Sequence, residues 1–124
     1  MSYVKIIYNK SSYYYKKASN EKMAILGIFL TSNVGYYPSS FKEWGTNDDW
    51  GDETNGNSIA LKKEGDYILL SDLYSEEETP TILKMTRKQY VQVITDWEEK
   101  VCKLKPNEVI IKYENDQFII ETKD

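Results

Sequence analysis

Apolar side chains recur every three or four positions along residues 85–106, MTRKQYVQVITDWEEKVCKLKP. On a helix, this spacing places them on one face, which then packs against the rest of the protein. A helix with one buried stripe is therefore predicted here. The stripe consists of Tyr90, Ile94, Trp97, Val101 and Leu104.

Both ends of this predicted helix carry recognisable signals. Thr86 followed by Gln89 forms a capping box, and Pro106 stands just beyond the last turn. Two pairs of opposite charge stand four residues apart on the solvent side, in the favourable order. These pairs are Asp96 with Lys100 and Glu99 with Lys103.

Elsewhere the chain is rich in β-branched and aromatic residues broken by turn-forming residues, which indicates strands. Residues 107–123 predict a hairpin with its turn at 114–117, and residues 58–73 predict a second hairpin with Glu64 and Gly65 at its turn. Single strands are expected at 3–8, 13–18 and 80–85.

Two further segments are less regular. The run 23–32 fits either a buried strand or a helix by periodicity, and Gly27 with two isoleucines inside it favours a strand. Ser40 with Glu43 indicates a short helical turn after Pro38. The elements together predict one domain, 1–124, of the α+β class. We expect a mostly antiparallel β-sheet with one long helix, in the C-terminal half, packed on one face.

Composition agrees with a compact soluble domain. The 124 residues are 40% hydrophobic and 29% charged, and no apolar run approaches the ~20 residues that span a bilayer. The first ten residues, MSYVKIIYNK, resemble a strand rather than a signal peptide. A single cysteine, Cys102, fits a reducing compartment. We therefore expect a cytoplasmic protein without a membrane partner.

The absence of histidine narrows the chemistry, because it removes the commonest general base and most zinc sites. Cys102 has Glu98 and Glu99 as helical neighbours, which disfavour a thiolate, so a structural cysteine is expected. We predict no catalytic residue, no cofactor and no metal site.

Charge is concentrated in the middle of the chain. Residues 41–80 hold eleven carboxylates against three lysines, a net charge of −8 within a chain of net charge −4. Such a block repels nucleic acid and attracts basic partners. The alternative is that these acidic loops only keep the protein soluble.

Within this block, residues 41–58 combine two tryptophans with several carboxylates. The spacing of oxygen ligands and glycines does not fit a helix–loop–helix calcium site in either register. A catalytic carboxylate pair stays open, because chain position does not give the gap between two groups. Trp44 and Trp50 fit either as anchors beneath a solvated loop or as contacts in a protein interface.

The C-terminal half, residues 68–123, resembles small bacterial immunity proteins of polymorphic toxin and contact-dependent growth inhibition systems. The similarity lies in the order of parts: a strand, an acidic loop, a strand entering a Thr-capped helix with the segment DWEE, a Lys–Pro turn and a closing hairpin. The resemblance implies binding to one cognate toxin, often a nuclease, and inhibition of it. It carries over no site residue.

An interface with a basic toxin surface is accordingly expected, with no nucleic acid bound. Its candidate residues form two groups, which we call the first and the second acidic block, with the two tryptophans beside the first. The competing hypotheses are a small-ligand or carboxylate-based enzyme domain with a Tyr/Trp-lined cleft, and an adaptor that binds no toxin. The residues are Asp48, Asp49, Asp52 and Glu53 (first block), Glu76, Glu77 and Glu78 (second block), and Trp44 and Trp50.

Overall fold

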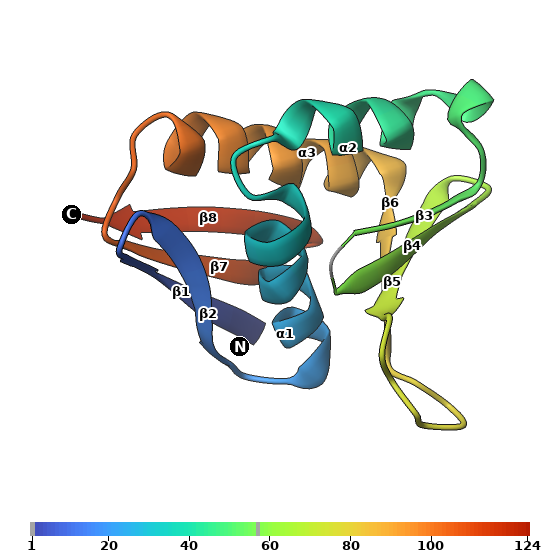
Figure 1. Ribbon diagram of the computed structural model, residues 1–124, viewed down its shortest axis with the longest axis horizontal. Helices are drawn as coiled ribbons and strands as arrows, with labels where there is room; N and C mark the ends of the chain where they lie inside the picture. Colours follow the sequence, from blue (N-terminus) through green and yellow to red (C-terminus); the bar gives the residue numbers. More distant parts are fainter. Residues whose placement is uncertain (1, 57) are drawn as a thin grey trace.

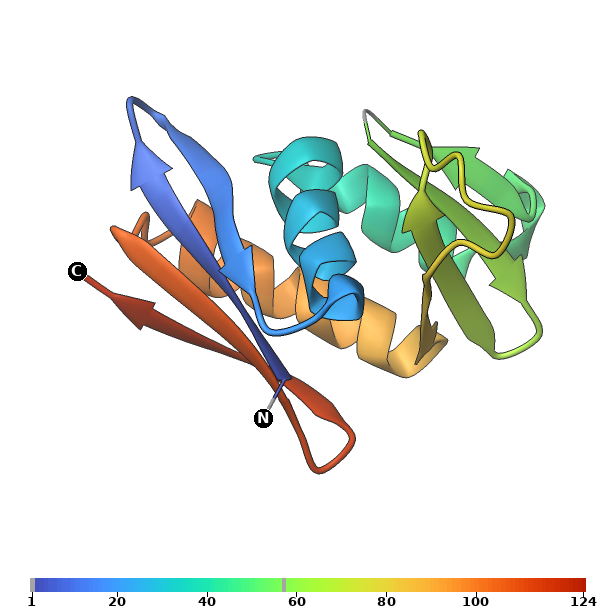
Figure 2. The same cartoon turned by 90° about the horizontal axis from the view of Figure 1, so that it is seen from below.

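A computed structural model describes residues 2–56 and 58–124, and it confirms the α+β class. The described residues form two four-stranded antiparallel sheets and three α-helices. Figures 1 and 2 show the helices lying between and beside the two sheets, so that each sheet contributes one face to the core. The predicted single sheet is therefore two.

The first sheet joins the two ends of the described chain. Its strands are ordered β2-β1-β7-β8, with β1 (Ser2–Asn9), β2 (Ser12–Ala18), β7 (Glu108–Glu114) and β8 (Gln117–Lys123). Both hairpins close with two-residue turns in which both residues have positive φ, as a type I′ turn requires. These turn residues are Lys10 and Ser11, and Asn115 and Asp116.

The second sheet has the order β3-β4-β5-β6, with β3 (Glu53–Asn55), β4 (Ile59–Glu64), β5 (Tyr67–Asp72) and β6 (Ile82–Thr86). The predicted hairpin at 58–73 is confirmed. Its turn lies at Gly65 and Asp66, one residue later than expected, and Gly65 supplies the positive φ of 61°. The three-residue strand β3 was not predicted from sequence.

The prediction of a strand at 23–32 is wrong. This run forms α1 (Glu21–Ile28), which continues as a π-helical segment, η1 (Phe29–Val34). The side chain of Asn20 starts the helix by accepting a hydrogen bond from Met23 N at 3.0 Å. Gly27 then allows close packing on the first sheet, because an added Cβ would lie only 2.6 Å from Val4 Cγ2.

The expectation of one long helix is also wrong. Two helical segments, 21–34 and 87–102, span 14 and 16 residues. The second comprises α3 (Arg87–Trp97) and η3 (Glu98–Cys102), and it begins with the predicted Thr86–Gln89 capping box. A shorter helix, α2 (Pro38–Thr46), extends the helical turn expected after Pro38, and the 3₁₀ turn η2 (Asp48–Trp50) follows it.

The apolar stripe of the C-terminal helix is confirmed except at its last member. Tyr90, Ile94, Trp97 and Val101 are buried, whereas Leu104 is 71% exposed because the helix ends at Cys102. Contacts run from α3 to β8, to β5 and β6, and to α2, so the helix touches both sheets rather than one face.

One of the two predicted charge pairs on this helix forms. Lys103 Nζ lies 2.9 Å from Glu99 Oε1. Lys100 instead donates to the carbonyl oxygen of Ile120, and Asp96 accepts from Gln92. Across residues 2–56 and 58–124, no helix is long and apolar enough to cross a membrane.

Candidate functional site

The first acidic block lies where α2 ends and the second sheet begins. Asn47 caps the turn η2 by accepting a hydrogen bond from Asp49 N at 3.0 Å. The chain then joins the sheet: Lys63 N donates to the carbonyl oxygen of Asp52 at 2.7 Å, and Glu53 is paired with Lys62. This block is therefore attached to the end of β4 that leads into the Gly65 turn.

Asp48 is engaged within the protein. Its carboxylate lies 2.6 Å from Arg87 Nη2, at the start of α3. This hydrogen bond and the charge of the Arg87 guanidinium lower the pKa of Asp48. The remaining carboxylates of the block form no ion pair within the described residues and face solvent.

The two tryptophans beside this block have opposite environments. Trp44 is 4% exposed and packs against Tyr90 in the core, so its predicted place in a binding surface is wrong. It belongs to the buried face of α2, which lies against α3. Trp50 is 49% exposed, and its ring is available to a partner.

The second acidic block lies at the opposite end of the second sheet. It belongs to the loop 73–81, which leaves β5 after Asp72, and Asp72 is paired with Ile59 at the start of β4. Glu53 of the first block pairs near the other end of β4. Figure 1 shows the loop at the bottom and η2 at the upper right, so the two blocks do not form one site.

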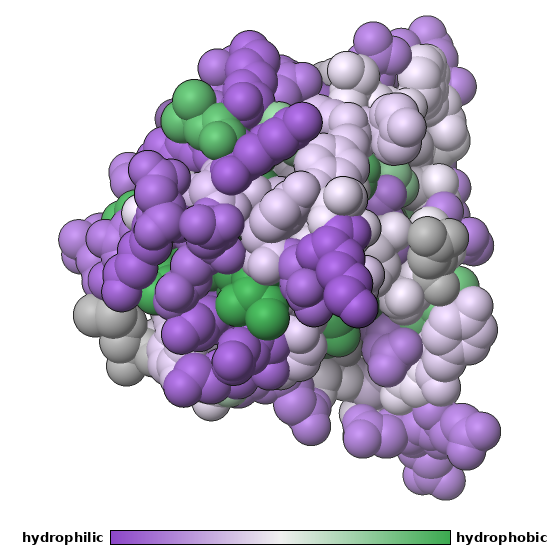
Figure 3. Space-filling view, turned by 60° about the vertical axis from the view of Figure 1, so that its left-hand side comes forward, coloured by the Kyte–Doolittle hydropathy of each residue, from purple (hydrophilic) through white to green (hydrophobic). Residues whose placement is uncertain are grey.

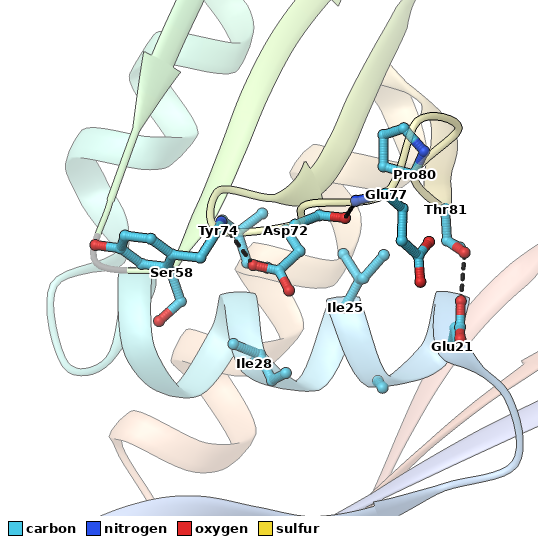
Figure 4. A pocket seen from close by; sticks show the side chains of 12 residues that line it. Glu21, Ile25, Ile28, Ser58, Asp72, Tyr74, Glu77, Pro80 and Thr81 are labelled. Carbon is cyan, nitrogen blue, oxygen red and sulfur yellow. Dashed lines mark hydrogen bonds between the residues drawn. The ribbon is translucent and has the colours of Figure 1, made fainter.

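A groove of about 510 Å³ lies between this loop and α1. Three carboxylates line it, from Glu21 at the start of α1, Asp72 at the end of β5 and Glu77 in the second block. Figure 4 shows the side chains of Asp72 and Glu77 directed toward α1. We call this the acidic groove.

Local hydrogen bonds hold the acidic groove in shape. Asp72 Oδ1 accepts from Tyr74 N at 2.9 Å, which tightens the turn that enters the loop. Glu21 accepts a hydrogen bond from Thr81, which ties the end of the loop to the first turn of α1. The two sides of the groove are thus connected at the Thr81 end of the loop.

The remaining lining of the acidic groove is apolar or aromatic. Ile25 and Ile28 form one wall on α1, and Tyr74, which is 72% exposed, stands at the rim. A lysine or arginine side chain suits such a surface, because its aliphatic stem covers apolar groups while its charge meets carboxylates. The chemistry available is therefore recognition of an amphipathic cation.

Of the three groove carboxylates, Glu77 alone was predicted from sequence as a site residue. Glu21 was not predicted as a site residue, because its place beside the groove depends on residues 21–28 forming a helix, and a strand was predicted for 23–32. The Asn20–Glu21 pair, a cap followed by an acid in the first turn, is the signal that could have found it. Asp72 was one of the eleven carboxylates in residues 41–80, but it was not named as a candidate site residue.

Cys102 behaves as the structural residue expected from sequence. Burial and the charge of Glu98 raise the pKa of its thiol, and its Sγ lies 3.4 Å from the carbonyl oxygen of Gly35. Among the described residues, no three or more Cys, Asp or Glu side chains are grouped so that they could hold a metal ion.

Comparison with known proteins adds no relative. No protein-family profile, no curated protein and no solved structure matches the chain. One whole face of the molecule presents mostly hydrophilic side chains with isolated hydrophobic ones, as Figure 3 shows.

Proposed function

We propose that this protein is an immunity protein that binds and neutralises a cognate bacterial toxin with a basic surface, such as a nuclease. The observation that carries the proposal is the acidic groove, which Glu21, Asp72 and Glu77 line together with apolar residues and an exposed tyrosine. The resemblance of residues 68–123 to immunity proteins supports the same role.

The proposed mode of action is capture of a toxin lysine or arginine. Its stem lies against Ile25 and Ile28, and its charge meets carboxylates that line the groove. A nuclease binds the phosphates of its substrate through such cations, so a bound immunity protein competes for them. Opposed charges also speed the encounter, and that effect weakens as salt rises.

The first acidic block is a separate region of negative charge, at the other end of the second sheet from the acidic groove. Asp49, Asp52 and Glu53 are exposed there beside Trp50. Aromatic side chains such as Trp50 supply large rigid contacts in protein interfaces. We assign the acidic groove as the main contact and this block as the competing location.

The experiment uses as the partner the product of the reading frame next to the gene for this protein. Two variants and the unchanged protein are compared for copurification, association rate and protection of cells that express the partner. The variants are the groove variant Glu21→Gln/Asp72→Asn/Glu77→Gln and the matched variant Asp49→Asn/Asp52→Asn/Glu53→Gln. The matched variant removes the same three charges from the other end of the sheet.

The expected result is loss of protection and slower association for the groove variant alone. Asp48 is left unchanged in the matched variant because its bond to Arg87 belongs to the fold. Loss in the matched variant alone would move the interface to the first acidic block. If the unchanged protein neither binds the partner nor protects, the immunity proposal is wrong.

A second candidate function is recognition of a small cationic ligand. The acidic groove, at about 510 Å³, lies within the ~300–1,000 Å³ typical of small-molecule sites. A polyamine such as spermidine, tested by calorimetry, would distinguish the two. Stoichiometric binding that the groove variant loses, without binding of the neighbouring gene product, would favour the small ligand.

A further inference from the structure

Asn55 is the only asparagine of the sequence that is followed by a glycine. The backbone nitrogen after an asparagine can attack the side-chain amide, and a glycine there has no Cβ to hinder the approach. Asparagine is counted among the thermolabile residues of proteins. The pair Asn55–Gly56 is therefore the place on this chain where the attack meets the least steric resistance.

This pair lies at the end of a short edge strand. Asn55 is the last residue of β3, a strand of three residues that pairs with β4 and stands first in the order of the second sheet. Figure 1 shows β3 running along the outside of β4, and the side chain of Asn55 is exposed. The end of such a strand opens at little cost, because few contacts must break.

Packing requires the glycine of this pair. A Cβ added at Gly56 would overlap the side chain of Asn33, which belongs to η1. Asn33 is itself held in place, because its Nδ2 donates to the carbonyl oxygen of Ile59 at 2.9 Å and its Oδ1 accepts from Ser58 N at 3.2 Å. A glycine must therefore follow Asn55 for the start of β4 to lie against η1.

One hydrogen bond restrains the attacking nitrogen. Gly56 N donates to the carbonyl oxygen of Ile59 at 3.2 Å, at the long end of the usual range. In an antiparallel pair every second residue bonds across, so the backbone groups of Asn55 point away from β4. Rotation of the peptide between Asn55 and Gly56 toward the side-chain amide breaks one backbone bond of the described chain, the bond to Ile59.

We propose that Asn55 is a site of spontaneous covalent modification in the folded protein. The backbone nitrogen of Gly56 attacks Cγ of Asn55, and the new C–N bond closes a five-membered succinimide ring. The side-chain nitrogen leaves as ammonia, which takes up the proton that Gly56 loses. Water then adds to either carbonyl carbon of the ring and breaks its bond to nitrogen, which gives aspartate or isoaspartate. Water is the only co-reactant.

Either product changes the β3 end of the first acidic block. Glu53 and residue 55 stand two positions apart on one strand, so a carboxylate at 55 adds a negative charge on the face that carries Glu53. Isoaspartate also inserts one carbon into the main chain, which displaces Gly56 from Ile59. The charge and the edge geometry of this block therefore depend on the age of the molecule. This inference is independent of the proposed toxin interface.

The experiment ages the intact protein in warm neutral buffer and follows its asparagines by peptide mapping that distinguishes aspartate from isoaspartate. Conversion at Asn55 exchanges ammonia for water and should be faster than at any other asparagine. Asn55→Gln should stop it, because glutamine has to close a less favourable six-membered ring. Asn55→Asp serves as the chromatographic standard for one of the two products.

A second comparison tests the restraint on Gly56. Since one hydrogen bond holds its nitrogen, the folded protein should react about two- to tenfold more slowly than a synthetic peptide of residues 50–60. Asn33→Ala removes the side-chain bonds to Ser58 and Ile59 and should bring the rate toward that of the peptide. Asn47→Ala, which removes the cap of η2 instead, is the matched control and should leave the rate unchanged.

The inference is overturned if Asn55 stays unmodified in the folded protein while the peptide converts, or if another asparagine converts first. It is equally overturned if the folded protein reacts more than about a hundredfold more slowly than the peptide, because the fold then protects the site. Equal rates for the unchanged protein and Asn33→Ala, both shown to be folded by circular dichroism, would reject the restraint by the start of β4.

Discussion

The ammonium group of Lys63 lies 2.8 Å from the carbonyl oxygen of Trp44 and 3.0 Å from that of Asn47. Both oxygens belong to the C-terminal end of α2, where helix carbonyls have no intrahelical partner. Lys63 is 4% exposed, and its charge also lies 4.6 Å from the centre of the Trp44 ring. A strand of the second sheet thus caps a helix with a buried cation, which the helix dipole favours.

Replacing this cation should destabilise the fold. Lys63→Met keeps an unbranched side chain but leaves the two carbonyl oxygens without their donor, and we expect a loss of about 2–3 kcal/mol in the free energy of unfolding. Urea denaturation measures it. Lys62→Met, at the exposed neighbouring position, is the matched control and should change little. Equal stability of both variants would contradict the capping role of Lys63.

Substitution of Trp97 should reduce the stability of the protein more than substitution at any other position of the C-terminal helix. Its ring is buried, and its Nε1 donates to the carbonyl oxygen of Gly35 at 2.8 Å. Trp97→Ala should cost about 3–5 kcal/mol, because it leaves a large cavity. Trp97→Phe should cost less, because it keeps an aromatic ring and leaves a smaller cavity, although it also loses the hydrogen bond. Chemical denaturation compares the two variants, and an unchanged midpoint for Trp97→Ala would disprove the core assignment.

Gly27 should tolerate no side chain. An added methyl group would lie 2.6 Å from Val4 Cγ2 and 3.3 Å from Tyr15 Cδ2, so α1 would have to move away from the first sheet. We expect Gly27→Ala to destabilise by about 1–3 kcal/mol, although alanine is the better helix former. Thermal melting measures it, with Lys22→Ala on the exposed side of α1 as the control. A more stable Gly27→Ala variant would show that the contact relaxes at no cost.

Tyr13 should make the protein sensitive to alkali. Burial raises its pKa to about 12, and its hydroxyl donates to the carbonyl oxygen of Pro106 at 2.5 Å. An unfolded tyrosine loses its proton near pH 10, so the folded state binds the extra proton between about pH 10 and 12. The stabilisation is complete below pH 10 and is lost as pH rises through this window, by roughly 2–3 kcal/mol in total.

The test compares free energies of unfolding from pH 8 to 12. Tyr13→Phe should be less stable near neutrality, because the hydrogen bond is gone, but its stability should fall less steeply above pH 10. Tyr14→Phe, at the exposed neighbour on β2, should keep the unchanged slope. Parallel pH curves for the unchanged protein and Tyr13→Phe would show that Tyr13 titrates normally.

Local signals predicted most of the elements correctly. The capping box at Thr86, the turn residues of the hairpins and the apolar stripe each depend on neighbours within a few positions, and each is present. The error at 23–32 has the same origin. Isoleucines and a glycine favour a strand locally, but Asn20 caps a helix and Gly27 is required by Val4, a residue distant in sequence.

Tertiary arrangement decided what the sequence could not. The strands divide into two sheets because β1 pairs with β7, near the C-terminal end, and not with a strand from the middle of the chain. In the sequence, the carboxylates of residues 41–80 form one acidic segment. In the structure, Glu53 and Asp72 of this segment lie toward opposite ends of the second sheet. Trp44 and Trp50 lie six positions apart in similar sequence contexts, but they differ in burial. Trp44 is on the face of α2 that packs against α3, whereas Trp50 lies beyond the end of α2.

The pairing of β1 with β7 has a consequence for how the chain folds. Ser2 pairs with Tyr113, so a strand inside the sheet meets its second neighbour 111 positions later. During synthesis β1 and β2 can form a hairpin early, but the sheet stays incomplete until β7 leaves the ribosome. Contacts so distant slow folding, since a long loop must close before they form. Until then the open side of β1 is free to pair with other chains, and this interval carries the greatest risk of aggregation.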